Sequence, residues 1–258
     1  MSVASHELTL HRRPLRSPPR GAPGERIYAI GDIHGRADLL AEMLEAIERD
    51  CLARPTQGRK VRLVFLGDFI DRGPSSKLLI LALREASRSE FATVLLGNHE
   101  QAMLSCASGM DEARDSWLMY GGAATLASFG IREPAEYEST EEFAGRLSEG
   151  LGEGILNWLR DLPLYWRSGD FFFCHAGVRP GRALHRQRPR DLLWIRSEFL
   201  ESSRYHGAII VHGHSITSTI DVQRNRIGID TGAYRTGRLT ALAIEDAQTW
   251  YLATEPTI

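Results

Sequence analysis

The chain has 258 residues, of which 43% are hydrophobic, so it can bury a sizeable core as one large α/β domain or as two small ones. Its formal net charge of -2 gives no overall attraction to nucleic acid or to an anionic membrane, and no apolar run approaches the roughly 18 residues that cross a bilayer. Three cysteines without a Cys-x-x-Cys spacing argue against a disulfide framework and favour the reducing cytoplasm.

The first 25 residues differ in composition from the rest of the chain. Residues 11–21 are basic and proline-rich and nearly free of large apolar side chains, so residues 1–25 are predicted to form a disordered arm. The pair Arg12-Arg13 is typical of a twin-arginine export signal, but Ser, Pro, Gly and Arg follow it instead of an apolar segment. We therefore reject an export signal. We expect one folded domain over residues 26–258, after the arm.

Strand and helix signals alternate from Arg26 onward. The predicted strands are 27–30, 61–66 and 93–96, and the predicted helices between them are 37–50 and 75–88. This alternation favours parallel strands joined by right-handed crossovers.

Each of these strands ends in Gly followed by a residue type that binds metals. The segments are Gly31-Asp32-Ile33-His34-Gly35, Gly67-Asp68 and Gly97-Asn98-His99-Glu100. In open α/β sheets such groups gather beyond the carboxyl ends of the strands, so these side chains are expected to converge. An Asp at such a turn can instead cap a helix, and Asn98 with Gln101 has capping-box spacing.

The middle of the chain, roughly residues 105–165, is predicted to be a helical cap with an acidic, solvated run. Short strands separated by turns then indicate a second, mostly antiparallel or mixed sheet. The strands expected there are 170–174, 208–211, 217–222, 226–230, 239–244 and 249–253. Two facing sheets with helices outside make a four-layer α/β/β/α sandwich, and His175 and His214 would join the same rim.

Five motifs in a fixed order carry a family resemblance. They are the three segments above, with the second extended to Gly67-Asp68-Phe69-Ile70-Asp71-Arg72-Gly73, followed by His175-Ala176-Gly177 and Gly213-His214. Together they resemble the calcineurin-like metallophosphoesterases, and among these the phosphoprotein phosphatase branch with its bacterial and lambda-phage-like members. The resemblance covers roughly residues 26–246.

The resemblance implies a binuclear metal centre. The implied ligands are Asp32, His34 and Asp68 for the first ion and Asp68, Asn98, His175 and His214 for the second, with Asp68 bridging. The resemblance suggests Mn²⁺, while the ligand types alone also allow Fe or Zn. His212 is expected to be packed and not to bind metal.

The same resemblance assigns the catalytic groups. A hydroxide bridging the ions would attack phosphorus in line, His99 would protonate the leaving alkoxide as general acid, and Asp71 would orient its imidazole. Arg72 would bind the phosphoryl group, and Arg196, in a Trp-x-Arg segment, is matched to the second family arginine, with a plain surface arginine as the alternative. Tyr234 is a further candidate for the rim.

We predict a metal-dependent phosphomonoesterase that acts on phosphoserine or phosphothreonine in proteins. Asp71 and Glu100 stand where the similar diadenosine tetraphosphate hydrolases usually have Ala and Asp, and Ile216 replaces the last histidine typical of superfamily phosphodiesterases. The alternative is a hydrolase of diadenosine tetraphosphate or other nucleotide polyphosphates, for which the arginines of 179–190 would be useful, although a solvated face explains them more simply. An inactive metal-binding protein is disfavoured because every expected ligand is present.

Overall fold

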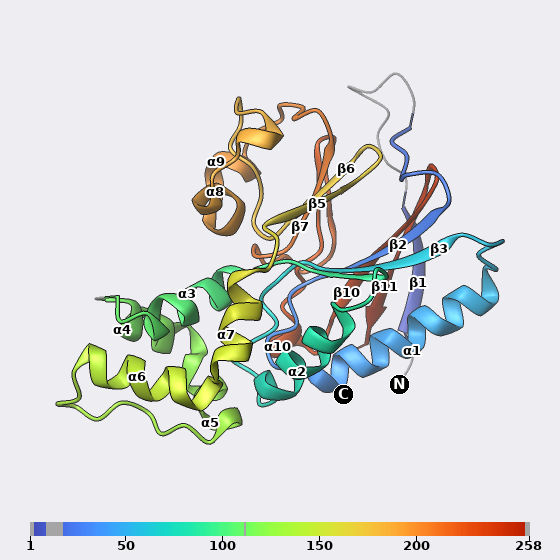
Figure 1. Cartoon of the computed structure of the whole chain (residues 1–258). Helices are drawn as coiled ribbons and strands as arrows, with labels where there is room; N and C mark the ends of the chain where they lie inside the picture. Colours follow the sequence, from blue (N-terminus) through green and yellow to red (C-terminus); the bar gives the residue numbers. More distant parts are fainter. Residues whose placement is uncertain (1–2, 9–17, 111, 256–258) are drawn as a thin grey trace.

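The computed structural model describes residues 3–8, 18–110 and 112–255. Two sheets face each other and helices cover the outer face of each, which confirms the predicted four-layer sandwich (Figure 1). No helix in these residues has both the length and the apolar character that a membrane crossing requires. Cys51, Cys106 and Cys174 are all free thiols.

The first sheet contains the parallel strands that the strand–helix alternation predicted. They are β2 (Glu25–Ile30), β3 (Lys60–Phe65) and β4 (Ala92–Val94). The chain crosses between them through α1 (Ala37–Ala53) and α2 (Ser76–Ala86). Both crossover helices pack on the outer face of this sheet.

The last two strands also belong to the first sheet, so their expected place in the second sheet is wrong. β10 (Thr240–Glu245) pairs antiparallel with β2, and β11 (Gln248–Thr254) pairs antiparallel with β10. A strand that is apolar on both sides fits either sheet, so its partner depends on contacts distant in sequence.

The predicted disordered arm is wrong for Val3–Leu8, which form β1 antiparallel to β11 and complete the sheet order β1-β11-β10-β2-β3-β4. A strand edge binds a further strand through backbone hydrogen bonds, which need no apolar side chains. Residues 9–17 of the predicted arm lie outside the described residues. Arg20 and Gly21 are held by backbone hydrogen bonds to Asp170 and Asp246.

The second sheet is mixed. Its strands, in spatial order, are β5 (Tyr165–Ser168), β6 (Phe171–Cys174), β7 (Ile209–His212), β9 (Arg226–Gly228) and β8 (Asp221–Val222). The three central strands are parallel, and β5 and β8 run antiparallel at the edges. The sequence did not indicate β5, and only the last two residues of the expected strand 217–222 are extended into the ladder. The short helices α8 (Pro189–Trp194) and α9 (Ser197–Leu200) cover the outer face.

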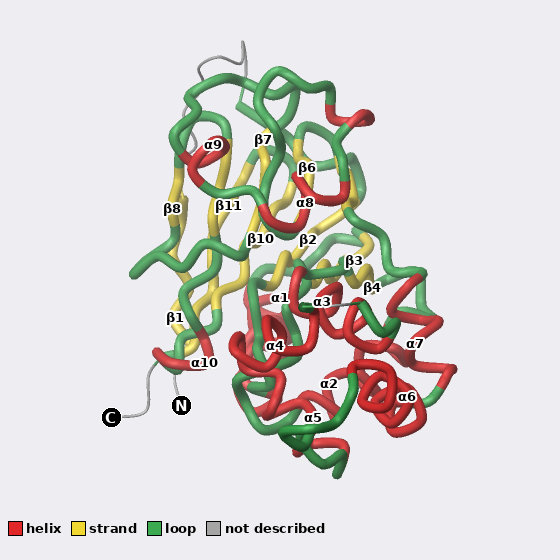
Figure 2. Tube along the Cα trace, turned by 90° about the vertical axis from the view of Figure 1, so that its left-hand side faces the viewer, coloured by secondary structure: helices red, strands yellow, loops and turns green. Residues whose placement is uncertain are grey.

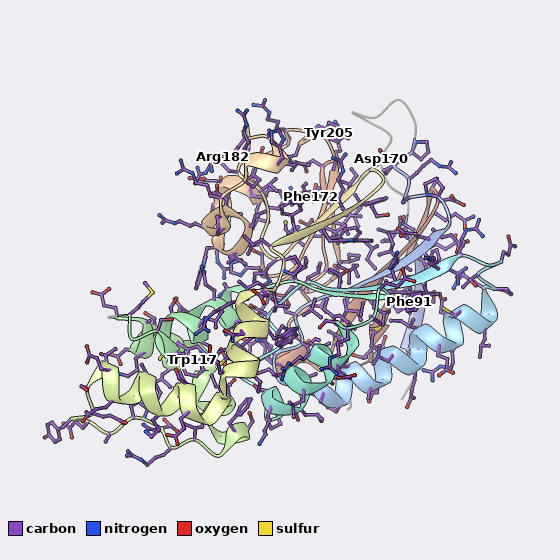
Figure 3. The ribbon with its side chains drawn as sticks, in the orientation of Figure 1. Phe91, Trp117, Asp170, Phe172, Arg182 and Tyr205 are labelled. Carbon is purple, nitrogen blue, oxygen red and sulfur yellow. The ribbon has the colours of Figure 1, made fainter. Side chains whose placement is uncertain are left out.

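Alternate side chains of each central strand enter different layers of the core. In β2, Ile27 and Ala29 pack between the two sheets, whereas Tyr28 and Ile30 pack against the helices. In β6, Phe172 (labelled in Figure 3) faces the layer of α8 and α9. Burial on both faces explains why these strands are continuously apolar instead of alternating.

The predicted helical cap forms a lobe beside α2 (Figure 2). It comprises α3 (Asn98–Ala107), α4 (Ala113–Trp117), the π-helical turn η1 (Leu118–Gly122), α5 (Ala123–Phe129), α6 (Thr140–Leu151) and α7 (Glu153–Arg160). Its buried side chains, such as Phe143 and Leu156, belong to the same hydrophobic cluster as those of α1 and α2. The lobe therefore shares the core of the sandwich.

A buried polar network fastens α1 to the first sheet. Asp50 of α1 accepts hydrogen bonds from the Tyr28 hydroxyl at 2.6 Å and from Trp250 Nε1 at 3.0 Å, and it also pairs with Arg54. Tyr28 and Trp250 lie on β2 and β11, so one carboxylate joins three elements.

Replacing Tyr28 by Phe removes one donor to this buried carboxylate without changing the apolar volume. We expect Tyr28→Phe to lower the free energy of unfolding by about 2 kcal/mol, because a hydrogen bond to a charged group is lost and the acceptor stays buried. Urea denaturation measures the change. Tyr137→Phe is the matched control, since Tyr137 is 92% exposed; equal stability of the two variants would contradict the role of the network.

Candidate active site

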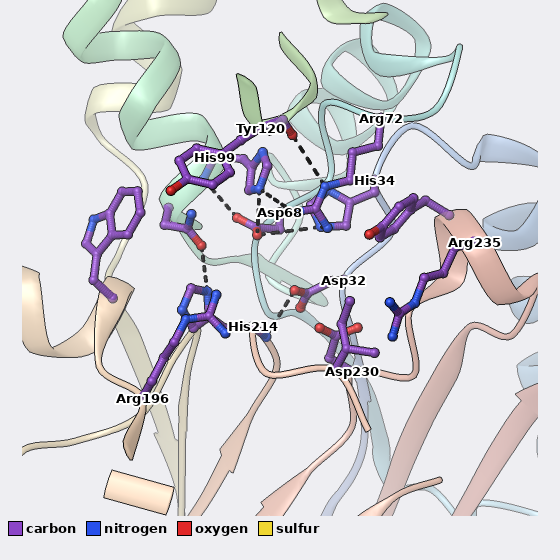
Figure 4. Close-up of a pocket in the computed structure, with 14 residues that line it drawn as sticks. Asp32, His34, Asp68, Arg72, His99, Tyr120, Arg196, His214, Asp230 and Arg235 are labelled. Carbon is purple, nitrogen blue, oxygen red and sulfur yellow. Dashed lines mark hydrogen bonds and ion pairs between the residues drawn. The ribbon is translucent and has the colours of Figure 1, made fainter. Parts of the chain in front are cut away.

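The predicted site residues meet at a cavity of about 370 Å³ at the carboxyl ends of the parallel strands of both sheets (Figure 4). Eight of the ten side chains predicted for the site line this cavity, whereas Asp71 and His175 do not. These two lie directly behind the wall, where His175 Nε2 is 2.8 Å from Asn98 Oδ1 and Asp71 Oδ2 is 2.7 Å from His99 Nδ1. The convergence expected from the strand ends is thus present.

Asp68 lies between two groups of ligand-type atoms. Its Oδ1 is 3.4 Å from His175 Nε2, which is itself 3.2 Å from His214 Nδ1. Its Oδ2 is 3.7 Å from His34 Nε2 and 3.8 Å from His99 Nε2. One carboxylate therefore presents one oxygen to each group, which is the arrangement that a carboxylate bridging two cations requires.

The two groups are compact enough for cations. The ligand atoms of His34, Asp68 and His99 all lie within 4.8 Å of one another, as do those of Asp68, His175 and His214. Carboxylate oxygen with imidazole nitrogen suits Mn, Fe or Zn. The resemblance implied Asp32 in place of His99 in the first group.

Asp32 also lines the cavity, but neither group includes it. Its Oδ2 accepts the backbone N–H of His214 at 3.0 Å, while its Oδ1 is buried without a hydrogen-bond partner among the described residues, as is His214 Nε2. Gly213 allows this approach, because a Cβ there would lie 2.0 Å from Asp32 Oδ1. Buried unpaired acceptors are costly unless a cation binds them, so these atoms fit the predicted metal centre.

Burial sets the charges of the candidate ligands. It lowers the pKa of His34 to about 3 and also lowers the pKa of His175 and His214, so these imidazoles are neutral and able to bind metal. Burial disfavours the charged form of Asp68, but the surrounding histidines, His175 and His99 first, lower its pKa below the usual range.

Strained backbone is concentrated at the site. His34, Asp68, Asp71, Arg72 and His214 all have positive φ, between 47° and 69°. Such residues cost of order 1–3 kcal/mol each and persist only where surrounding structure holds them. At the turn after β3, the carbonyl of Asp68 accepts the backbone N–H groups of residues 33 and 34, which locks two ligand turns together.

Glu100 holds the same turn from the other side. Its carboxylate, fully buried, accepts the backbone N–H groups of Gly97, Asp68, Phe69 and Ile70 at 2.9, 2.9, 2.9 and 3.2 Å. Burial and the nearby charge of Asp68 raise the pKa of Glu100 to about 8, and the backbone donors counter this rise only in part. The sequence placed Glu100 in a motif but did not indicate this function.

His99 and Asp71 form a supported pair. Asp71 Oδ2 accepts Trp117 Nε1 at 2.9 Å and Asp71 Oδ1 accepts the Thr125 hydroxyl at 2.6 Å, so its orientation towards His99 is fixed. Burial by itself would lower the pKa of His99, but the negative charges of Asp68 and Asp71 outweigh it and raise the pKa. A protonated imidazole with its Nε2 at the cavity can donate a proton there.

Two arginines face each other across the cavity (Figure 4). The Arg72 guanidinium lies 3.0 Å from His34 Nε2 and 3.1 Å from His99 Nε2, and it stacks over Tyr234 at 4.5 Å from the ring centroid. Arg196 lines the opposite wall and is exposed at its rim. Both guanidinium groups can therefore bind a phosphoryl group in the cavity.

Some residues of the site were missed from the sequence. Trp117 and Thr125 come from the helical lobe, and no local pattern links them to Asp71. Asp230 follows β9, is buried and lines the cavity, so its position after a strand end could have marked it. His212 packs edge-on against Phe199 with ring centroids 5.1 Å apart, in agreement with its expected packing role.

The family model for calcineurin-like phosphoesterases matches residues 25–239. The chain belongs to this family. Its two compact groups of His and Asp side chains could hold the divalent metal centre of a metallophosphoesterase. The site's groups of Asp, His and Asn ligand atoms fit that centre.

Relatives of this calcineurin-like phosphoesterase include two kinds of enzyme. Serine/threonine-protein phosphatase 1 of Salmonella typhimurium is 30% identical over 227 residues, which are 85% of this chain and 92% of that protein. A symmetrical bis(5'-nucleosyl)-tetraphosphatase of Methylococcus capsulatus is 29% identical over 154 residues, 60% of this chain. The chain spans only 44% of the length of that tetraphosphatase.

A solved structure shares the fold of this calcineurin-like phosphoesterase. The protein serine/threonine phosphatase from Saccharomyces cerevisiae superposes with a TM-score of 0.59 over 93% of this chain and 85% of its own, at 14% identity. An identity this low supports the fold alone.

Replacing Glu100 by Gln tests whether its hydrogen bonds to the backbone N–H groups around Asp68 position this metal ligand. The amide NH₂ of Gln would face backbone N–H donors, so we expect Glu100→Gln to weaken Mn²⁺ binding by about 10–100-fold, as loss of a supporting contact to a metal ligand typically does. Isothermal titration of metal-free protein measures the affinity. Glu149→Gln, on the exposed face of α6, should leave it unchanged. An unaltered affinity in a folded Glu100→Gln variant would refute this role.

Proposed function

We propose that this phosphoesterase is a phosphomonoesterase, specifically a cytoplasmic serine/threonine protein phosphatase that uses Mn²⁺. The observation that carries the proposal is the His99–Asp71 contact of 2.7 Å, held by Trp117 and Thr125 at the wall of the cavity. A general acid is needed most where the leaving group is a serine or threonine alkoxide, which departs poorly without a proton. The Salmonella phosphatase, which matches along nearly its whole length, supports the same substrate class.

The residues of the chain divide the chemistry among them. Two divalent ions, held by Asp32, His34, Asp68, Asn98, His175 and His214, would neutralise phosphoryl charge and supply the nucleophilic water. Arg72 and Arg196 bind the phosphoryl oxygens from opposite walls and orient phosphorus towards Asp68. His99 donates its proton to the leaving oxygen. Asp71 keeps the imidazole oriented and stabilises its charged form.

Hydrolysis of diadenosine tetraphosphate is the second candidate. Three aromatic side chains, Tyr120, Trp194 and Tyr234, line the cavity and could stack on nucleoside bases. The match to the Methylococcus tetraphosphatase also favours it, although that match leaves more than half of the tetraphosphatase uncovered.

Replacing His99 by Asn separates acid catalysis from binding. We expect kcat of His99→Asn to fall by roughly 10²–10⁴-fold on a phosphothreonine peptide, because its alkoxide needs the proton. On p-nitrophenyl phosphate the loss should be much smaller, because p-nitrophenolate leaves unprotonated. Steady-state kinetics of the Mn²⁺-loaded enzyme give both values. Equal losses on the two substrates would contradict the general-acid role.

Side-by-side turnover of two substrates tests the substrate class. We expect kcat/KM to be higher for a phosphothreonine peptide than for diadenosine tetraphosphate, since the cavity carries a supported general acid. Asp68→Asn should abolish both activities because it removes the shared ligand, and this controls for contaminating phosphatases. A clear preference for the dinucleotide would assign the second candidate instead.

A further inference from the structure

A second groove opens beside the catalytic cavity. It has a volume of about 370 Å³, and Trp194 and Arg196 line both the groove and the cavity, so the two adjoin. The remaining walls come from Arg179, from α8 and from α9, and the two helices lie together in Figure 1. A molecule whose phosphoryl group sits between Arg72 and Arg196 can thus extend into this groove.

Two arginines of the basic segment 179–190 serve to build the groove. Asp191, which is only 4% exposed, accepts Arg179 Nε at 3.0 Å and also pairs with Arg182 (labelled in Figure 3). Arg179 Nη1 lies 2.6 Å from a carboxylate oxygen of Glu198 in α9. These charges are neutralised within the protein. Arg179 therefore shapes the wall and Arg182 supports it through Asp191, and both leave little attraction for a ligand.

Arg190 and Arg196 differ from those two. Both are exposed, both line the groove, and neither has a carboxylate within ion-pair distance in the part of the chain that the structure describes. Glu198 is the other acidic side chain in this wall besides Asp191, and it is already paired with Arg179. When Arg196 binds the phosphoryl group at the cavity, Arg190 remains available in the groove. A guanidinium there favours an anionic ligand, since its planar donors match carboxylate and phosphate.

We propose that this groove binds a second anionic group of the substrate, namely the carboxylate or phosphate of a residue that flanks the phosphoresidue in a peptide. The proposal rests on the proposed protein phosphatase function and names the substrate class more narrowly. An extended peptide advances about 3.3–3.6 Å per residue, so a residue a few positions from the phosphoresidue can reach from the cavity into the adjoining groove. Trp194, between them, offers an apolar surface for the intervening chain.

Peptides that differ only in flanking charge test the proposal. One phosphothreonine peptide carries glutamates on both sides of the phosphoresidue, and its partner carries glutamines at the same positions. We expect kcat/KM of the Mn²⁺-loaded enzyme to favour the glutamate peptide by about two- to fivefold, the range of partly exposed ion pairs. The preference should shrink as salt is raised, because screening weakens such pairs.

Charge reversal locates the effect. Arg190→Glu should reverse the preference, so that the glutamine peptide becomes the better substrate. Arg49→Glu is the matched control, because Arg49 is an exposed arginine on α1, on the far side of the first sheet from α8 (Figure 1). It should keep the wild-type preference. Equal kcat/KM for the two peptides, or the same preference in Arg190→Glu as in wild type, would overturn the proposal.

A third substrate, diadenosine tetraphosphate, distinguishes failure of the groove proposal from failure of the proposed protein phosphatase function. If neither peptide is turned over while diadenosine tetraphosphate is, the protein phosphatase assignment fails. The groove is then tested on the dinucleotide, whose phosphate chain offers the same chemistry. A drop in kcat/KM for it in Arg190→Glu, with none in Arg49→Glu, would retain the anion-binding groove with a polyphosphate as its ligand, and an unchanged value would overturn the groove as well.

Discussion

The arrangement of the site depends on one buried carboxylate. Asp68 is 2% exposed and offers Oδ1 to His175 and Oδ2 to His34 and His99. A carboxylate in this position is stable only because positive or polarisable groups surround it on both sides. Both sheets supply those groups: the turns after β2 and β3 come from the first, and His175 and His214 follow strands of the second. The site therefore needs both sheets of the sandwich, just as the hydrophobic core does.

Holding Asp68 in place requires support that lies outside the cavity. The turn after β3 has positive φ at Asp68, Asp71 and Arg72, and such a turn relaxes unless its backbone groups are bound. Glu100 accepts three N–H groups of this turn and a fourth from Gly97, and the Asp68 carbonyl accepts two more from the turn after β2. The fully buried Glu100 is thus part of the active-site scaffold, although it does not face the cavity.

The helical lobe contributes to chemistry as well as to packing. Trp117 and Thr125 donate hydrogen bonds to Asp71, and Tyr120 lines the cavity. The π-helical turn between α4 and α5 places its Gly121 carbonyl at the backbone N–H of Arg72. This lobe is inserted between β4 and β5. It therefore positions the proposed general acid, through Asp71, and the phosphate-binding Arg72. Its own sequence shows only an ordinary helical pattern.

The sequence by itself determined the parts that follow local rules. Apolar runs ending in Gly and a ligand residue placed Asp32, Asp68 and Asn98 at strand ends, and parallel β–α alternation brings such ends to one edge of a sheet. Tertiary structure alone decided that β10 pairs with β2, that Trp117 and Thr125 hold Asp71, and that Asp191 neutralises Arg179 and Arg182 while Arg190 stays available. Periodicity shows how a segment buries its faces. It carries no information on which distant segment completes a hydrogen bond or an ion pair, because that choice is made by packing of the whole chain.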